Sequence, residues 1–131
     1  MKVLLVDDHV LFREGLSSLL TRLPDIHIIE TAETISETVE KAQNSKPDLI
    51  LMNFNLSDGN GLEAVHTILA ECPDTNIVFL TTHDEDERLA EAIRFGALGY
   101  LNKSISLKKF LAFIRSVKTN GDATIKPLIV N

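Results

Sequence analysis

The sequence predicts an α/β fold, a doubly wound sheet of five parallel strands with helices on both faces. Strand-like and helix-like segments alternate five times along the 131 residues, a pattern typical of parallel sheets with helical connections. The strand-like segments are apolar along most of their length, as strands buried on both faces must be. The length fits one domain, for which we expect residues 1–119, with residues 120–131 as a linker or C-terminal tail.

The first half of the chain contains three expected strands and two expected helices. The strands are expected at residues 2–6, 26–31 and 49–53. Apolar residues at helical spacing predict a helix over about residues 9–23, which Pro24 ends. A weaker apolar stripe predicts a second helix over residues 34–45, and Pro47 stops it.

The second half continues the alternation after a turn at residues 57–61, which is rich in residues that tolerate positive φ. Strands are expected at residues 76–80 and 99–102, and helices at residues 62–71, 85–95 and from Ser106 to about 118. The acidic run at 84–87 suits the positive end of a helix dipole better than a metal site. Phe113 lies off the main apolar stripe of the last helix, so it is either a partly buried edge residue or an exposed contact residue.

Composition excludes several classes of protein. The net charge of −6 argues against nucleic-acid binding by the chain as a whole. Residues 103–131 are nonetheless basic, either as a solvated helix face or as a docking surface for an acidic partner. No apolar run approaches the roughly 18 residues that span a bilayer. The single cysteine, Cys72, cannot form an internal disulfide, which suits a reducing cytoplasm, and we expect a cytoplasmic protein.

Polar residues gather where the predicted strands end. Asp7-Asp8 follow the first strand; the other such residues are Asn53, Asn55, Thr81 and Lys103. In parallel sheets, ligands bind at the carboxyl ends of the strands. Paired carboxylates and a carbonyl suit Mg²⁺, and a lysine with a hydroxyl suits the oxygens of a phosphoryl group. Each residue also has an ordinary explanation, such as helix capping by the acidic pair, but their joint placement favours a site.

Four segments carry a resemblance to a known family. They are VLLVDDHVLFREGL, PDLILMNFNLSDGNGLEA, IVFLTTHDEDE and GALGYLNK. Together they resemble the signature blocks of response-regulator receiver domains of two-component signalling, over about residues 2–118. The first block especially resembles the subfamily with a C-terminal LuxR-type helix-turn-helix module. The resemblance implies a flavodoxin-like receiver fold that accepts a phosphoryl group from a histidine kinase or a small acyl phosphate.

The resemblance also implies roles for particular residues. The positions that match the family's Mg²⁺ site are Asp7, Asp8 and Asn55, with Asp8 as a direct ligand and Asn55 contributing its backbone carbonyl. The positions that match the phosphoryl-binding and switch residues are Thr81, Tyr100 and Lys103. Asn53 stands where the family has the aspartate that accepts the phosphoryl group.

Asn53 is the main departure from the family pattern. An amide oxygen is a poor nucleophile, so we expect no ordinary phosphorylation at this position. With two carboxylates in place of three, Mg²⁺ binding should be weakened. We expect the Asn53 NH₂ to donate to Asp7 or Asp8. The residue can be natural, as in an atypical receiver, or an engineered replacement of aspartate, or another residue can take the phosphoryl group.

The leading functional hypothesis is a regulatory interaction module of a transcriptional regulator, not an enzyme. Its output surface would combine the fourth helix, the fifth strand and the last helix. Expected partners are a cognate histidine kinase or another regulatory protein, and a second copy in a homodimer. We expect contact with DNA only through a C-terminal module that this chain does not contain, and no contact with a membrane.

Two rival classes remain open at this point. One is a Mg²⁺-dependent phosphoryl-transfer enzyme or hydrolase with Asp7 or Asp8 as its nucleophile. His9 and His83 lie near the same edge, where we interpret them as rim residues instead of catalytic ones. The other is a flavin-binding protein of similar topology, which the lack of a Ser/Thr/Gly-rich phosphate cradle after the first strand disfavours.

Overall fold

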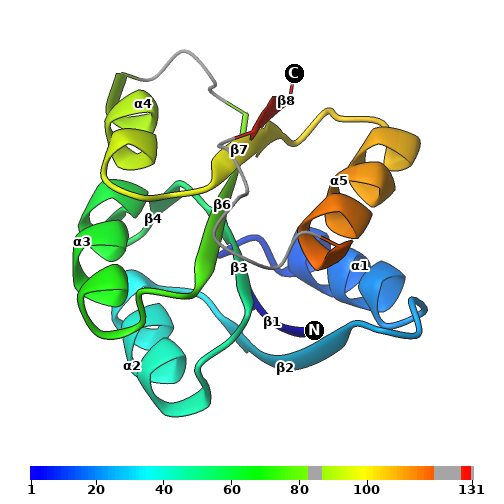
Figure 1. Ribbon diagram of the computed structural model, residues 1–131, viewed down its shortest axis with the longest axis horizontal. Helices are drawn as coiled ribbons and strands as arrows, with labels where there is room; N and C mark the ends of the chain where they lie inside the picture. Colours follow the sequence, from blue (N-terminus) through cyan, green and yellow to red (C-terminus); the bar gives the residue numbers. More distant parts are fainter. Residues whose placement is uncertain (83–86, 120–127, 131) are drawn as a thin grey trace.

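A parallel β-sheet forms the centre of the computed structural model, which describes residues 1–82, 87–119 and 128–130. Its strands are β1 (Lys2–Val6), β2 (His27–Ala32), β3 (Leu49–Asn53), β6 (Asn76–Thr81), β7 (Gly99–Asn102) and β8 (Leu128–Val130). They lie in the order β2-β1-β3-β6-β7-β8, and every neighbouring pair is parallel (Figure 1). The predicted sheet of five parallel strands is therefore confirmed, and a sixth short strand extends it.

Helices cover both faces of the sheet, as a doubly wound fold requires. They are α1 (Val10–Leu20), α2 (Ile35–Ser45), α3 (Gly61–Glu71), α4 (Glu87–Arg94) and α5 (Leu107–Thr119). Helices α1 and α5 lie on one face, and α2, α3 and α4 lie on the other (Figure 1). No helix of the described residues combines the length and apolar character needed to cross a bilayer.

The element boundaries differ from the predicted ones in a few places. Helix α1 ends at Leu20, inside the predicted range 9–23, because the following backbone forms tighter turns such as Leu23 N to Leu20 O (3.0 Å). The predicted start of α4, at residue 85, lies outside the described residues, as does most of the acidic run. The predicted turn contains a two-residue hairpin of β4 (Asn55–Leu56) and β5 (Gly59–Asn60).

That turn also caps a neighbouring helix. The Asp58 carboxylate accepts hydrogen bonds from the backbone N–H groups of Ile35 (2.7 Å) and Ser36 (3.1 Å), at the start of α2. The bond from Ile35 is the main reason that the pKa of Asp58 lies below its ordinary value. Thr34 caps the same helix by accepting from Glu37 N (3.1 Å). Contacts from the turn thus tie the loop after β3 to α2.

Two apolar cores flank the sheet. The core under α2, α3 and α4 contains Phe54 and Phe79, whose rings meet edge to face with centroids 5.0 Å apart. The core under α1 and α5 contains Phe113, which is only 4% exposed. Both alternatives for Phe113, a partly buried edge residue and an exposed contact residue, are therefore wrong, because the ring lies in the core with its neighbour Ile114.

The strand β8 lies in the segment for which we expected a linker or tail. Its three residues pair with β7, in the register Gly99 with Leu128 and Tyr100 with Ile129. The sequence pattern did not predict this strand, since an isolated three-residue apolar run has no period to detect. The boundary at residues 119 and 120 stays a prediction.

Replacing Gly61 by alanine should destabilise the fold. A Cβ at this buried first residue of α3 would overlap the Phe79 ring and lie 2.8 Å from Cδ1 of Phe54. We expect Gly61→Ala to lower the free energy of unfolding by about 1–3 kcal/mol, measured by urea denaturation. The matched control is Gly15→Ala in α1, where nothing lies within 4 Å, and it should stabilise by about 0.5–1 kcal/mol. Equal effects would contradict this account.

Candidate functional site

Parallel pairing brings the polar strand ends together. The central strands β1, β3, β6 and β7 are neighbours in the sheet, so the residues at their carboxyl ends share one edge. Asp7 follows β1, Asn53 ends β3, Thr81 ends β6 and Lys103 follows β7. The cross-strand partner of Thr81 is Asn102, next to Lys103. The structure thus gathers the predicted site residues at one edge, on four adjacent strands.

The carboxylate of Asp7 is the centre of this site. Its side chain is fully buried. Its Oδ2 accepts a hydrogen bond from Lys103 Nζ (2.8 Å), and its Oδ1 accepts one from the backbone N–H of His9 (2.9 Å). The Nδ1 of His9 also lies 2.9 Å from Oδ1. Both oxygens therefore have partners within the chain.

Opposing effects act on the pKa of Asp7. Burial favours the neutral acid and raises the pKa, but the hydrogen bond and charge of Lys103, with the bonds from His9, favour the carboxylate. Together these contacts outweigh burial, so the pKa lies below its ordinary value of 3.8. Asp7 is thus a buried, ionised carboxylate at neutral pH.

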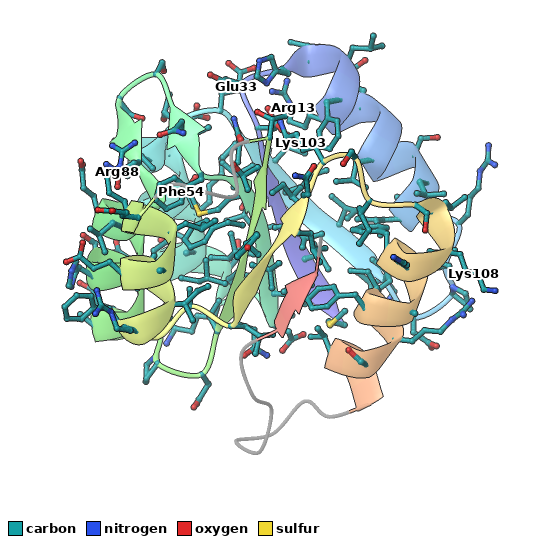
Figure 2. The ribbon with its side chains drawn as sticks, turned by 90° about the horizontal axis from the view of Figure 1, so that it is seen from above. Arg13, Glu33, Phe54, Arg88, Lys103 and Lys108 are labelled. Carbon is teal, nitrogen blue, oxygen red and sulfur yellow. The ribbon has the colours of Figure 1, made fainter. Side chains whose placement is uncertain are left out.

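Lys103 is held from two sides. Besides its bond to Asp7, its ammonium lies 4.4 Å from the centre of the Phe12 ring, within cation–π distance. Its side chain is 12% exposed. Figure 2 shows Lys103 near Arg13 and Glu33 at the top of the sheet, whereas Lys108 lies away from them on α5. Lys103 is therefore an ordered part of the site and not a free surface lysine.

Asn53 makes a different contact from the predicted one. Its Nδ2 donates to the backbone carbonyl of Asn55 (2.8 Å), whereas we expected a bond to Asp7 or Asp8. The cause is local: Asn55 lies in β4, in the turn that directly follows β3, and its carbonyl lies within reach of the Asn53 amide. The amide thus occupies the carbonyl that the resemblance assigned to Mg²⁺.

The remaining predicted residues differ in exposure. Thr81 is 3% exposed, and Tyr100 is buried in the core cluster on the α4 side of the sheet. Asp8 is exposed at about a third of its side chain, and its Oδ1 lies 3.4 Å from His9 Nδ1. Asn55 is exposed. Asp8 and Asn55 thus face solvent, while Thr81 and Tyr100 lie within the fold.

The donor set suits a hard divalent cation. Oxygens of Asp7, Asp8 and the Asn55 backbone are the ligands that Mg²⁺ prefers. Ligand atoms of Asp7, Asp8 and His9 lie within 4.8 Å of one another. In the structure, however, Asp7 is paired with Lys103 and the Asn55 carbonyl with Asn53. The chemistry fits Mg²⁺, and two of the ligand groups already accept hydrogen bonds within the chain.

Sequence reasoning missed Arg13. Its Nη1 donates to the backbone carbonyl of Asp7 (2.6 Å), and its Nη2 pairs with Glu33 Oε1 (3.0 Å). Arg13 thereby links α1 to the segments that follow β1 and β2. Its place one residue after Phe12 gave no signal, because an arginine in a helical pattern is typical of a solvated face. His83, predicted at the rim, lies outside the described residues.

Comparisons with known proteins agree on one family. A family model for the response regulator receiver domain matches residues 3–115. The chain is 36% identical over 121 residues to the DNA-binding transcriptional activator DevR/DosR of Mycobacterium tuberculosis, covering 92% of this chain and 54% of that protein. It is 34% identical over 128 residues to the oxygen regulatory protein NreC of Staphylococcus carnosus, covering 97% and 58%. The chain thus spans about half the length of the curated relatives it matches.

Solved structures show the same similarity. The response regulator domain of Thermotoga maritima CheB superposes with a TM-score of 0.81 at 28% identity, covering 94% of this chain and 97% of that one. A two-component response regulator of the LuxR family from Aurantimonas sp. SI85-9A1 superposes with a TM-score of 0.84 at 27% identity, covering 95% and 89%.

Removal of the Lys103 ammonium should destabilise the fold in a pH-dependent way. In Lys103→Met, Asp7 stays buried without its cation, so we expect the free energy of unfolding at pH 7 to fall by about 3 kcal/mol. The lowered pKa of Asp7 means that its contribution is complete above pH 3.8 and is lost as the pH falls through the folded-state pKa. The difference between variant and unmodified chain should therefore shrink on acidification.

Urea denaturation between pH 7 and pH 3 measures this difference. The control is Lys108→Met, an exposed lysine of the same charge on α5, which we expect to change stability by less than about 0.5 kcal/mol. A loss for Lys103→Met that does not depend on pH would assign the effect to packing on Phe12 instead of the ion pair.

Proposed function

Because the chain belongs to the response regulator receiver domain family, we propose that it is a signal-input domain that works without an aspartyl phosphate. The proposal includes membership of the LuxR-type regulators, supported by the relatives and by the LuxR-family structure. The relative DevR/DosR is a DNA-binding transcriptional activator. We propose that this chain likewise regulates transcription, through a DNA-binding module outside residues 1–131.

The observation that carries the proposal is the hydrogen bond from Asn53 Nδ2 to the Asn55 carbonyl (2.8 Å). Asn53 ends β3 at the position of the family's acceptor. An amide lacks the negative oxygen that would attack phosphorus. It also carries an NH₂ donor that a carboxylate lacks, and this donor holds the loop after β3 in place. Asn53 thus replaces a reactive group by a structural one.

The ion pair of Lys103 with Asp7 supports the same conclusion. In a phosphorylated receiver, the lysine that Lys103 matches would bind the phosphoryl oxygens. Without that group, the Lys103 ammonium stays within 2.8 Å of Asp7 Oδ2 and against the ring of Phe12. Its charge is therefore compensated inside the chain. The site is self-contained, and we infer that its state is set by protein contacts and not by phosphorylation.

Mg²⁺ has a reduced role in this proposal. Receiver domains bind the ion at their acidic pocket, where it would neutralise phosphoryl oxygens; here Asp8, Asp7 and the Asn55 carbonyl would hold it. Asn53 adds no charge to this set and donates to one of its members. We infer that the chain binds Mg²⁺ more weakly than a receiver with an aspartate at this position.

The proposed partners are proteins. They are a cognate histidine kinase or another regulatory protein, and a second copy of the chain. The output surface would be formed by α4, β7 and α5, where Tyr100 connects the sheet to the α4 side. A hydrolase that uses Asp7 as nucleophile is disfavoured, because both oxygens of this fully buried carboxylate already accept hydrogen bonds.

Phosphorylation tests the acceptor position directly. The unmodified chain and Asn53→Asp are incubated with a small acyl phosphate and Mg²⁺ and then weighed intact by mass spectrometry. We expect only Asn53→Asp to gain a phosphoryl group, because only the carboxylate can attack phosphorus. Asn53→Ala is the matched control and should stay unlabelled. Labelling of the unmodified chain would mean that another residue is the acceptor, and labelling of none would mean that the pocket no longer supports the reaction.

Metal binding separates the two effects of Asn53. We expect Asn53→Asp to bind Mg²⁺ at least roughly tenfold more tightly, because an added charge beside the cation is worth more than about 1.4 kcal/mol. Asn53→Ala frees the Asn55 carbonyl without adding charge, so its gain should be smaller. Isothermal titration calorimetry measures the three affinities. Equal affinities of the unmodified chain and Asn53→Asp would contradict the proposal that Asn53 weakens Mg²⁺ binding.

A further inference from the structure

The outer edge of β7 binds an extended segment. Among the residues that the structure describes, the sheet continues beyond β7 only through β8, which pairs with Gly99, Tyr100 and Leu101 in parallel register. An edge strand of this kind offers a row of backbone donors and acceptors to any strand that can reach it. The structure shows that Leu128–Val130 is a segment that this edge accepts.

The connection from β7 to β8 has an unusual hand. Helices α2, α3 and α4 lie on one face of the sheet, and each belongs to a connection whose second strand lies nearer to β8 than its first. Helix α1 lies on the other face and belongs to a connection that leads in the opposite direction, from β1 to β2. These four connections therefore share one hand. The connection through α5 also moves toward β8, but α5 lies on the α1 face (Figure 1), so it has the opposite hand.

This hand disfavours pairing within one chain. Connections between parallel strands of one sheet are right-handed in about 98% of cases, because strand twist and helix hand favour that return path. The connection through α5 departs from this rule, and only three residue pairs join β8 to β7. If β8 comes from a second copy, the same pairs form and the hand of the connection no longer matters. Exchange of an identical element between copies is a low-cost route to a dimer.

We propose that the outer edge of β7 is a strand-exchange site at which Leu128–Val130 of a second copy of this chain binds. The inference rests on the proposed function, because it identifies the surface through which the proposed homodimer would form. The pairing itself depends on β7 and β8 and not on Asn53. The exchanged strand lies beside Tyr100, whose register partner is Ile129. Dimer formation is thereby placed next to the residue proposed as a switch.

Backbone alternation identifies the groups that carry the pairing. The N–H of Lys103 donates to Thr81 O (2.8 Å), on the β6 side. Because successive strand residues direct these groups to opposite sides, Leu101 also faces β6 and Tyr100 faces β8. The register partner of Tyr100 is Ile129, which therefore directs its N–H away from β7. The N–H of the next residue, Val130, is directed toward β7.

Two proline variants exploit this difference. Val130→Pro removes a backbone donor of the pairing, and Ile129→Pro removes a donor that faces away from β7, a position where an edge strand tolerates proline. Light scattering after size-exclusion chromatography, over a series of rising concentrations, gives the oligomeric state. We expect a dimer for the full chain and for Ile129→Pro, and a monomer for Val130→Pro.

A mixed-label experiment distinguishes exchange from pairing within one chain. ¹⁵N-labelled chain is mixed with unlabelled Asn131→Cys chain that carries a nitroxide; the native Cys72 is buried. With exchange, the nitroxide of one copy broadens the Leu101 amide signal of the other beyond detection. Phosphorylation plays no part in this readout, so its failure and failure at Asn53 are distinguishable.

Each outcome decides the proposal. Dimers that require the Val130 N–H, with loss of the Leu101 signal in the mixture, establish the exchange site. A full chain that stays monomeric, or a dimer whose Leu101 signal is unaffected by the nitroxide, overturns it. A dimer that persists in Val130→Pro also overturns it, because self-association would then use another face.

Discussion

The fully buried charge of Asp7 is the constraint around which the carboxyl edge of the sheet is organised. A carboxylate that loses its hydration needs charge and hydrogen bonds from the protein. Lys103 provides both across the sheet, from the end of β7, and it is itself held against Phe12 of α1. Arg13 binds the backbone carbonyl of the same aspartate. One buried charge therefore ties β1, β7 and α1 into a single structure.

This organisation explains how the site tolerates Asn53. With the charge of Lys103 compensated by Asp7, an aspartate on β3 is not needed to balance the ammonium. The uncharged Asn53 side chain is free to bond to the Asn55 carbonyl and stabilise the loop. The charged groups of Asp7 and Lys103 and the Asn53 amide thus form internal contacts, which is the basis for the proposed role without an aspartyl phosphate.

Particular residues show which parts of the site could be predicted from the sequence. Asp7, Asn53, Thr81 and Lys103 could be placed on one edge because each follows or ends a recognisable strand, and parallel strands end together. The partner of the Asn53 amide could not be placed, since its direction depends on the path of the turn after β3. Arg13 was not predicted for a similar reason: its two partners, Asp7 and Glu33, lie on different segments that only folding brings together.

By itself the sequence determined the alternating α/β fold, the five main strands and the edge that carries the polar residues, because apolar periodicity and strand order are local properties of the chain. Only the tertiary structure decided which polar atoms pair, that Phe113 is buried, and that Leu128–Val130 adds to the sheet. These outcomes depend on contacts between residues far apart in sequence. A three-residue strand acquires its structure from the edge of β7, which supplies the hydrogen bonds that no local pattern encodes.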